Sequence, residues 1–456
     1  MLVSTVFERF VAKSPATVML RGILERALAP DHLEQLFADT AQQQYTRELL
    51  FSTTVDLLAT VACRIQPSVH AAYQADREAV AVSVRALYDK LARLEPALSE
   101  ALVRHTADTL KPLLRQLGAT RPPLVPGYAT KILDGNHLGA SERRLKGLRD
   151  LAAGALPGQT LVVLEPAYQL ASAVFCCEDG HAQERSLLDR VLAQAQARDL
   201  YLADRNFCTT GFLFGLADRR AGFLIRQHAS TLSWHREGRR RRVGRTATGL
   251  VYEQTLWLED DTGRTLQVRR ITLVLDQPTR EGDTEIHVLT NLPRSLLGAR
   301  RVAELYRQRW TIEHLFLNLT TILHCELNTL PYPKAALFGF CVALAAGNVL
   351  ATVKGALAAV HGAPAIDAEL SEYQLALEVR GKYQGMMVAL PPEEWAAVRA
   401  LSGEAFARWL LELARGVDLR RFPKKPRGPK KPKARRTRFA QKKHIATARL
   451  LNGDYD

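Results

Sequence analysis

The chain has little cysteine, with six cysteines in 456 residues. Two of them, Cys176 and Cys177, are adjacent, the others are isolated, and no CxxC or Cys/His set has the spacing of a zinc site. This excludes a disulfide scaffold and disfavours metal thiolates. A reducing interior, the cytoplasm, is the expected compartment.

The chain also lacks the apolar run of a signal peptide, because Glu8 and Arg9 interrupt its start. A single stretch, Ala335–Val353, has about the length of a bilayer span. It is built largely from alanine and glycine and contains Asn348. Small residues add little to the free energy of transfer into lipid but allow close helix packing, so a buried helix is favoured over a membrane span.

Acidic residues are missing from one segment. Between Leu419 and Gly453 there are 14 lysines or arginines and no aspartate or glutamate. The formal net charge is +15, from 62 basic and 47 acidic residues. The remaining 48 basic residues nearly balance the 47 acidic ones, so the excess positive charge belongs to the C-terminal segment.

This C-terminal segment reads RRFPKKPRGPKKPKARRTRFAQKK. Its spaced prolines exclude a helix and its charge excludes a core, so we expect an extended polycation. Such a segment binds polyanions by releasing counterions, and nucleic acid is favoured over a solubilising or membrane-surface role because no hydrophobic anchor accompanies the charge. The expected DNA contacts include Lys424, Lys425, Lys430 and Lys431.

A second basic cluster, HREGRRRRVGR, spans His235–Arg245 and has glycines near its edges. It is typical of a basic loop, and we expect Arg239, Arg240 and Arg241 to contact DNA. A solvated hairpin tip is an equally good interpretation.

Hydrophobic periodicity divides the chain. From Thr17 to about Leu117 apolar residues recur at helical spacing. Within this helical part, Asp76–Pro96 could hold a recognition helix capped by Ser83, with four exposed side chains. Those side chains are Arg85, Tyr88, Lys90 and Arg93. A plain amphipathic bundle helix explains the same segment.

After the proline-rich break at residues 121–127, the pattern changes to short apolar runs bounded by turns. The predicted order is three strands, a helix and a returning strand, which indicates a mixed sheet covered by helices. The predicted ranges are strands at 130–133, 161–164, 171–177 and 200–203 and a helix at 182–197. Period-two alternation then predicts a β-rich unit over 221–291, with a turn at Asp260–Gly263, and helical signals resume at about Leu297 and run to about Leu411.

Two aspartates follow apolar runs, Asp134 in TKILDGNHL and Asp204 in LYLADRNF. A carboxylate at the end of a strand can point into a cleft beside the sheet. Each has a structural alternative, because Asp-Gly favours a hairpin turn and Asp204 could cap a helix.

A helical stripe adds a third acidic residue. In ELYRQRWTIEHLFLNLT the side chains of Tyr306, Arg309, Glu313 and Thr320 fall on one narrow face at about 100° per residue. Because Arg309 and Glu313 are four residues apart, a structural salt bridge is the alternative to a functional site.

These motifs, together with TNLP at residues 290–293, resemble the DDE transposases of bacterial insertion sequences, in the branch with a Y-x2-R-x3-E-x6-K signature. The resemblance covers about residues 130–355. It implies an α/β fold with an RNase H-like mixed-sheet core interrupted by a β-rich insertion. Together with the helical periodicity before Leu117 and the charge after Leu419, the expected fold adds an all-helical N-terminal domain and a disordered or extended basic C-terminal tail. The chain is expected to divide into six regions. These are a helical N-terminal domain that could bind DNA (1–120), the first part of the catalytic core (121–220), the β-rich insertion (221–293), the second part of the core with the glutamate helix (294–360), a helical C-terminal region (361–417) and the basic tail (418–456).

The resemblance also implies chemistry. Asp134, Asp204 and Glu313 would hold two Mg²⁺ or Mn²⁺ ions, with Asp134 bridging them. Water would attack the transposon end to free a 3′-OH, which would then attack the opposite strand or target DNA. Arg309 and Tyr306 would grip the phosphate near the cut, and Trp310 or Trp257 could stack on an unpaired base, although core packing is the better expectation for both tryptophans.

The expected partners are transposon ends and target DNA, and no membrane is expected to take part. We expect a homodimer to act on the DNA in the bacterial cytoplasm, at the nucleoid. The chain departs from the signature at its last position, where Thr320 replaces lysine; this leaves the ligand set intact and weakens the expected positioning of the DNA end, for which Arg307 is a possible substitute. Two alternatives stay open: another metal-dependent RNase H-like nuclease or resolvase, and an inactive DNA-binding relative.

Overall fold

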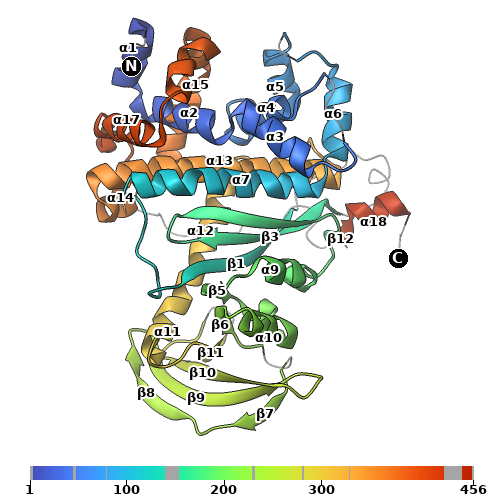
Figure 1. The fold of residues 1–456 in the computed structure, drawn as a ribbon, viewed down its shortest axis with the longest axis vertical. Coiled ribbons are helices and arrows are strands. Elements are labelled where there is room, and N and C mark those ends of the chain that lie inside the picture. The colour runs from blue at the N-terminus through green and yellow to red at the C-terminus, as the bar shows by residue number, and fades with distance from the viewer. Residues whose placement is uncertain are drawn as a thin grey trace.

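The computed structural model describes residues 4–44, 48–78, 80–138, 154–228, 232–279, 282–327, 329–425 and 444–453. A layer of helices lies over one end of a ten-stranded sheet, and a β-rich insertion forms the other end of that sheet (Figure 1). The mixed sheet, the insertion and the helical N-terminal region agree with the predicted RNase H-like fold.

The N-terminal part is helical, as predicted. Its helices are α1 (Thr5–Lys13), α2 (Pro15–Ala27), α3 (Pro30–Thr40), α4 (Phe51–Ala62), α5 (Val69–Ala75), α6 (Val84–Arg93) and α7 (Pro96–Gln116). Proline opens α2, α3 and α7, at the position where its missing N–H costs nothing.

Helix α6 begins as predicted, because the Ser83 side chain accepts a hydrogen bond from the amide of Ala86. Its proposed recognition surface is only partly correct. Tyr88 packs against the hydrophobic core, and the Lys90 ammonium donates to the Leu49 carbonyl. The amphipathic bundle helix is therefore the better interpretation of this segment.

The core half of the sheet has the order β4-β3-β1-β5-β6. Its strands are β1 (Ala129–Leu138), β3 (Gly158–Glu165), β4 (Leu170–Cys177), β5 (Asp199–Ala203) and β6 (Gly222–Arg226). Strand β3 is antiparallel to β1 and β4, whereas β1, β5 and β6 run parallel. Between β4 and β5 lie η1 (Glu184–Leu187) and α9 (Leu188–Gln194), and after β5 come η2 (Arg205–Phe207) and α10 (Thr210–Asp218).

The sheet continues through the insertion in the order β6-β11-β10-β9. These strands are β9 (Gly249–Glu259), β10 (Thr265–Leu275) and β11 (Glu285–Thr290). The predicted turn joins β9 to β10, with Gly263 at a positive φ that favours glycine.

Most of the predicted basic loop lies in two short edge strands, which corrects the prediction. β7 (Trp234–Glu237) pairs with one part of β9 and β8 (Arg241–Thr246) pairs with another, so residues 234–246 follow the outer side of β9. The glycines bounding the cluster misled the prediction, because Gly244 lies within the paired strand and not at a loop end.

The C-terminal half carries α11 (Ala299–Tyr306), η3 (Arg307–Trp310), α12 (Thr311–Thr321) and the long α13 (Pro333–His361), followed by a group of shorter helices. That group comprises α14 (Ala363–Glu369), α15 (Glu372–Ala389), η4 (Pro392–Trp395), α16 (Ala396–Arg399), α17 (Gly403–Arg415) and η5 (Leu419–Arg421).

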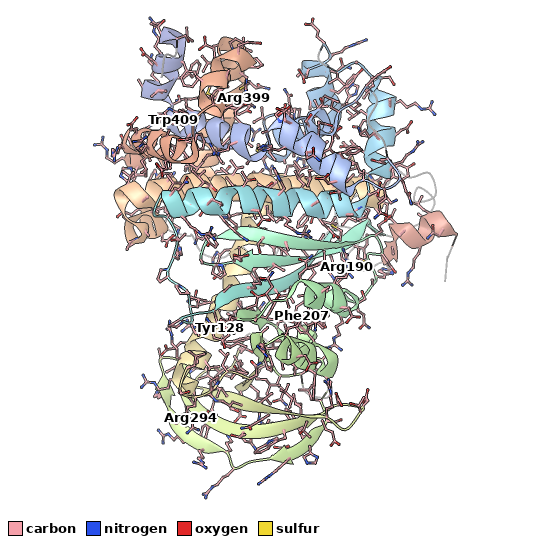
Figure 2. All side chains as sticks on the ribbon, viewed as in Figure 1. Tyr128, Arg190, Phe207, Arg294, Arg399 and Trp409 are labelled. Atoms are coloured by element: carbon pink, nitrogen blue, oxygen red, sulfur yellow. The ribbon has the colours of Figure 1, made fainter. Side chains whose placement is uncertain are left out.

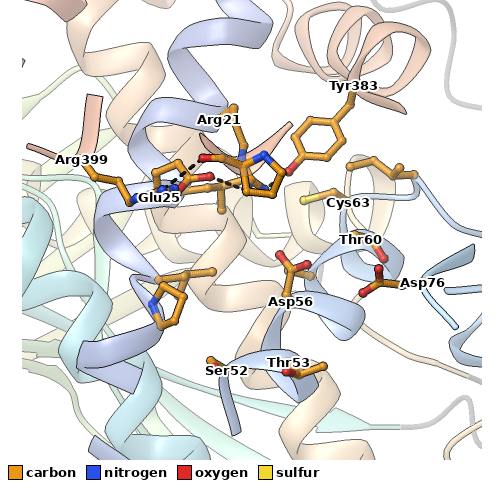
Figure 3. A pocket seen from close by; sticks show the side chains of 16 residues that line it. Arg21, Glu25, Ser52, Thr53, Asp56, Thr60, Cys63, Asp76, Tyr383 and Arg399 are labelled. Atoms are coloured by element: carbon orange, nitrogen blue, oxygen red, sulfur yellow. Dashed lines mark hydrogen bonds and ion pairs between the residues drawn. The ribbon is translucent and has the colours of Figure 1, made fainter. Parts of the chain in front are cut away.

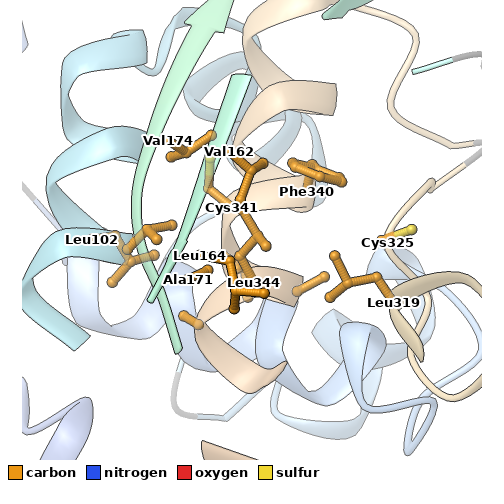
Figure 4. Packing of buried hydrophobic residues seen from close by; sticks show 14 of the residues in the cluster. Leu102, Val162, Leu164, Ala171, Val174, Leu319, Cys325, Phe340, Cys341 and Leu344 are labelled. Carbon is orange, nitrogen blue, oxygen red and sulfur yellow. The ribbon is translucent and has the colours of Figure 1, made fainter. Parts of the chain in front are cut away.

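Helix α13 is long and apolar enough to cross a membrane, but 83% of its most apolar window is buried inside the protein. It lies beside α7 across the sheet (Figure 1). Figure 4 shows its Phe340, Cys341 and Leu344 among residues of the β3–β4 pair and Leu319 of α12. The predicted buried helix is confirmed.

Side chains from this helical layer close the outer edge of β4. The amide of Asn348 on α13 both accepts from the Ala171 amide, at 2.8 Å, and donates to the Ala171 carbonyl, at 2.9 Å. Glu100 of α7 accepts from the Cys176 amide at 2.7 Å. All six cysteines are free thiols, as the scarcity of cysteine predicted.

The described parts of the basic segment Leu419–Gly453 pair with other parts of the protein. Pro423 pairs with Leu370, and β12 (His444–Ala446) forms a parallel pair with β2 (Gly154–Leu156), followed by α18 (Thr447–Asn452). Figure 2 shows the core elements, where Tyr128, Arg190 and Phe207 are labelled, between the helical layer with Arg399 and Trp409 and the insertion with Arg294.

Candidate active site

Strand register brings Asp134 and Asp204 to the same place. Strands β1 and β5 are parallel neighbours, with Ile132 opposite Leu202. Continuing this register by two residues sets Asp134 beside Asp204. Asp134 lies inside β1, which runs on to Leu138, so its predicted position at a strand end and the alternative of a hairpin turn are both wrong.

Alternation of side chains puts both aspartates on the same face of the sheet. Ile132 and Leu202 belong to one hydrophobic cluster, and residues two further along a strand point to the same side. Ile312 and Leu319 of α12 belong to that cluster as well. Helix α12, which carries Glu313, therefore crosses the face on which the two aspartates lie.

The predicted stripe is interrupted by η3, so its four side chains do not share one regular helix. Arg309 nevertheless joins two of the carboxylates. Its guanidinium lies 3.0 Å from Glu313 Oε1 and 3.3 Å from Asp134 Oδ2. The salt bridge expected within the helix is present, and the second contact ties it to β1.

Burial raises the pKa of Asp134 to about 7. Arg309 opposes this shift, while the negative charge of Asp204 adds to it, and the Gly135 amide donates to the Asp134 carboxylate at 3.1 Å. The Asp134 carboxyl therefore exchanges its proton near neutral pH, and any added positive charge would stabilise its ionised form.

Tyr306 and Arg309 share the same electrostatic environment. Burial raises the pKa of Tyr306 well above its ordinary value, and the neighbouring Arg309 partly offsets that shift. Burial alone would lower the pKa of Arg309, but Tyr306, Asp134, Glu313 and Asp204 together raise it. Arg309 is thus held as a cation at the centre of the cluster.

Asp204 caps the short helix η2. Its Oδ1 accepts from the amide of Asn206 at 2.7 Å. The alternative interpretation of Asp204 as a cap is confirmed, and the cap fixes the carboxylate where β5 ends.

The donor chemistry of the cluster suits a hard divalent cation, because Asp134, Asp204 and Glu313 offer only carboxylate oxygens. Among the described residues, no three His, Cys, Asp or Glu side chains lie close enough to hold a metal ion. Arg309 supplies the positive charge between Asp134 and Glu313. A cation shared by these carboxylates would therefore take over the role of Arg309.

The remaining predicted residues of the stripe lie at the surface. Thr320 is exposed and donates to carbonyls of its own helix, while Arg64 of the N-terminal part donates to the Thr320 carbonyl at 3.0 Å. Trp310 is 53% exposed, so core packing was the wrong expectation for it. Trp257 is half-buried, with Arg236 over its ring at 5.0 Å.

The predicted basic contacts have different settings. Arg239 and Arg241 are exposed, whereas Arg240 stacks on Tyr252 and pairs with Glu285 at 3.0 Å. Lys424 is exposed and donates to the Asp367 carbonyl, and Lys425 is exposed. Lys430 and Lys431 fall outside the described residues.

Sequence reasoning missed Glu184, a fourth carboxylate beside Asp134. In HAQERSLL it looks like an ordinary acidic residue ahead of a helix, and only its contacts with Gly135 and Asn206 distinguish it.

A separate cavity of about 270 Å³ lies in the helical layer, away from this cluster. Figure 3 shows Arg21, Glu25 and Arg399 linked on one side of it, with Asp56 and Cys63 facing its interior. None of the predicted site residues lines it.

The strand order, with antiparallel β3 and parallel β1, β5 and β6, defines an RNase H-like core. Acidic residues on two central strands and on a crossing helix are typical of enzymes that act on phosphodiesters. Residues 169–346 match the family model described as the transposase DDE domain. The matched part includes Asp204 and Glu313 and begins after Asp134, so this stretch of the chain is similar to the catalytic domain of DDE transposases. No curated protein matches the chain.

Proposed function

We propose that this protein cleaves the ends of a bacterial insertion sequence in a reaction dependent on divalent metal and joins them to target DNA. The observation that carries the proposal is the contact of Arg309 with both Asp134 and Glu313, on the face where strand register sets Asp204. The match to the transposase DDE domain supports DNA cleavage and transposition as the reaction, and the acidic cluster provides the residues that would carry it out.

In this proposal, Asp134, Asp204 and Glu313 hold two Mg²⁺ or Mn²⁺ ions. Bound divalent cations would supply Lewis-acid stabilisation of the scissile phosphate and of the attacking oxygen. Asp134 is held by β1 and by the Gly135 amide, and Asp204 by its cap. Glu313 has an exposed side chain on α12 and can turn towards either partner.

Arg309 then has a second task. Once freed from the carboxylates, its planar guanidinium can bind the scissile phosphate through two parallel hydrogen bonds. Tyr306 contacts Arg309 from the preceding helix and limits its movement.

The exposed surfaces suggest the path of DNA. Trp310 adjoins Arg309 and is exposed enough to stack on an unpaired base. Arg239, Arg240 and Arg241, together with the lysines after Pro423, would contact the DNA backbone. Because two ends must be cut and joined together, we propose that a homodimer acts on DNA.

The test is cleavage of a duplex carrying the inverted repeat that flanks the gene for this protein, in Mn²⁺. We expect Glu313→Gln to lower the cleavage rate about 10³-fold or more, since residues of one catalytic unit are not replaceable singly. Glu304→Gln, on the adjoining α11 and paired with Arg301, is the matched control and should cleave like wild type. Cleavage by Glu313→Gln at the wild-type rate would contradict the assignment.

Two other outcomes separate the alternatives. Cleavage without joining of a precut end to plasmid DNA would identify a nuclease or resolvase. Binding of the end without cleavage would identify an inactive DNA-binding relative, the reading motivated by Thr320.

A further inference from the structure

Glu184 approaches the acidic cluster from the opposite face of the sheet. It begins η1, whose Leu187 packs in the same hydrophobic cluster as Leu133. The Glu184 carboxylate lies against Gly135, the residue after Asp134, and a methyl group at position 135 would overlap it. Strand β1 therefore accommodates Glu184 only because residue 135 has no side chain.

Asn206 connects Glu184 with Asp204. Its side-chain amide donates to Glu184 Oε2 at 2.6 Å, and its backbone amide donates to Asp204 Oδ1 at 2.7 Å. Arg185 donates to the Asn206 carbonyl at 2.6 Å. Two neighbouring residues of η1 thus bind the side-chain amide and the backbone carbonyl of Asn206, and the backbone amide of Asn206 binds Asp204.

The environment of Glu184 makes these contacts effective. Its side chain is 18% exposed, and a hydrogen bond to a carboxylate is stronger than one between neutral groups. His137 lies 4.0 Å from its other oxygen. A fixed second layer of this kind keeps a metal-binding carboxylate in its productive orientation.

We propose that Glu184 is a positioning residue for Asp204, acting through Asn206, in the DNA cleavage proposed above. The inference rests on that proposed function. Glu184 supports the turn after β5 from behind the sheet, while the side chains of Asp134 and Asp204 face α12. Its contribution is the hydrogen bond that it accepts, because it lies on the face away from the reacting groups.

This assignment distinguishes two substitutions. Glu184→Gln keeps an acceptor oxygen for Asn206 and should cleave the flanking repeat within about threefold of wild type. Glu184→Ala removes the acceptor and should lower both cleavage and Mn²⁺ affinity by about 10- to 100-fold, the usual effect of losing such a support. Mn²⁺ affinity is measured by electron paramagnetic resonance without DNA, and Asp189→Asn, an exposed acidic residue of α9, is the control.

Gly135 provides a second, independent variant. Gly135→Ala should displace the Glu184 side chain and reproduce the Mn²⁺ affinity of Glu184→Ala. In the double variant the second substitution should add less than about twofold, because coupled residues are not additive.

The outcomes are decisive. If the cleavage rate and Mn²⁺ affinity of Glu184→Gln fall as far as those of Glu184→Ala, the charge of Glu184 is what matters and the positioning assignment is wrong. The assignment is also wrong if Glu184→Ala has the cleavage rate and Mn²⁺ affinity of wild type. If wild type binds Mn²⁺ but does not cleave the repeat, the proposed function fails, while the Mn²⁺ affinities of the variants still test Glu184.

Discussion

Two arginines, Arg21 in the helical layer and Arg309 at the sheet, have similar partners and different surroundings. Arg21 contacts Glu25 and the Tyr383 hydroxyl, and Arg399 closes the group by donating to Glu25 at 2.7 Å. Arg309 contacts Glu313, Asp134 and the neighbouring Tyr306.

The difference lies in exposure and in the balance of charge. The Glu25 side chain is 5% exposed and has two arginine partners, whereas the Glu313 side chain is 54% exposed and shares one arginine with Asp134. The first group is closed and nearly neutral. The second has an excess of acid that faces solvent. The same residue types thus stabilise the fold in one place and offer a site for a cation in the other.

Removing each arginine should give the largest contrast in stability. Arg21→Met leaves Glu25 and Asp56 in a cavity where burial already raises the pKa of Asp56, and we expect a loss of about 3–5 kcal/mol. Arg309→Met should cost about 1 kcal/mol or less, because Glu313 can be hydrated and Asp134 can take up a proton. Urea unfolding followed by circular dichroism measures both, and equal losses would contradict the comparison.

The second contrast is the dependence of stability on pH with a chelator present. The folded protein keeps a proton on Asp134 up to about pH 7, whereas the unfolded chain loses it near 3.8. Stability is therefore lost as the pH rises through this window. Asp134→Asn should be more stable than wild type by about 1–3 kcal/mol near pH 8 and equal to it below about pH 4.

Thermal unfolding of both proteins across that pH range measures this difference. A variant less stable than wild type near pH 8 would show that the contact with Arg309 outweighs the cost of burying the carboxylate.

The smallest expected effect concerns the exposed arginines of the insertion. Replacing Arg239 and Arg241 by glutamine should weaken binding to duplex DNA and reduce the slope of log K against log salt by about 1–2. Arg240→Gln should change the slope less, because Arg240 already pairs with Glu285 and stacks on Tyr252. Fluorescence anisotropy at several salt concentrations measures the slopes, and a larger change for Arg240→Gln would reverse this ranking.

Much of the fold was predictable because its signals are local. Alternating apolar residues located β9 and β10, Ser83 located the start of α6, and the four-residue spacing of Arg309 and Glu313 predicted their salt bridge. Each of these features depends on residues close together in the chain.

The features that were missed depend on contacts between distant segments. An Asp-Gly pair favours a turn in isolation, but pairing with β3 and β5 carries β1 through Asp134 and on to Leu138. Glu184 reaches Gly135 only because η1 is folded against β1. Most of the arginine cluster lies in edge strands because β9 is long enough to pair with both β7 and β8.

The way α13 and α7 cover β4 limits how two copies of this protein can associate. An uncovered outer strand invites another chain to extend the sheet, which leads to domain swapping or aggregation. Here the amide of Asn348 stands in for a neighbouring strand at Ala171, and Glu100 does so at Cys176. The proposed dimer on DNA would therefore use other surfaces, and its two sheets would stay separate at this edge.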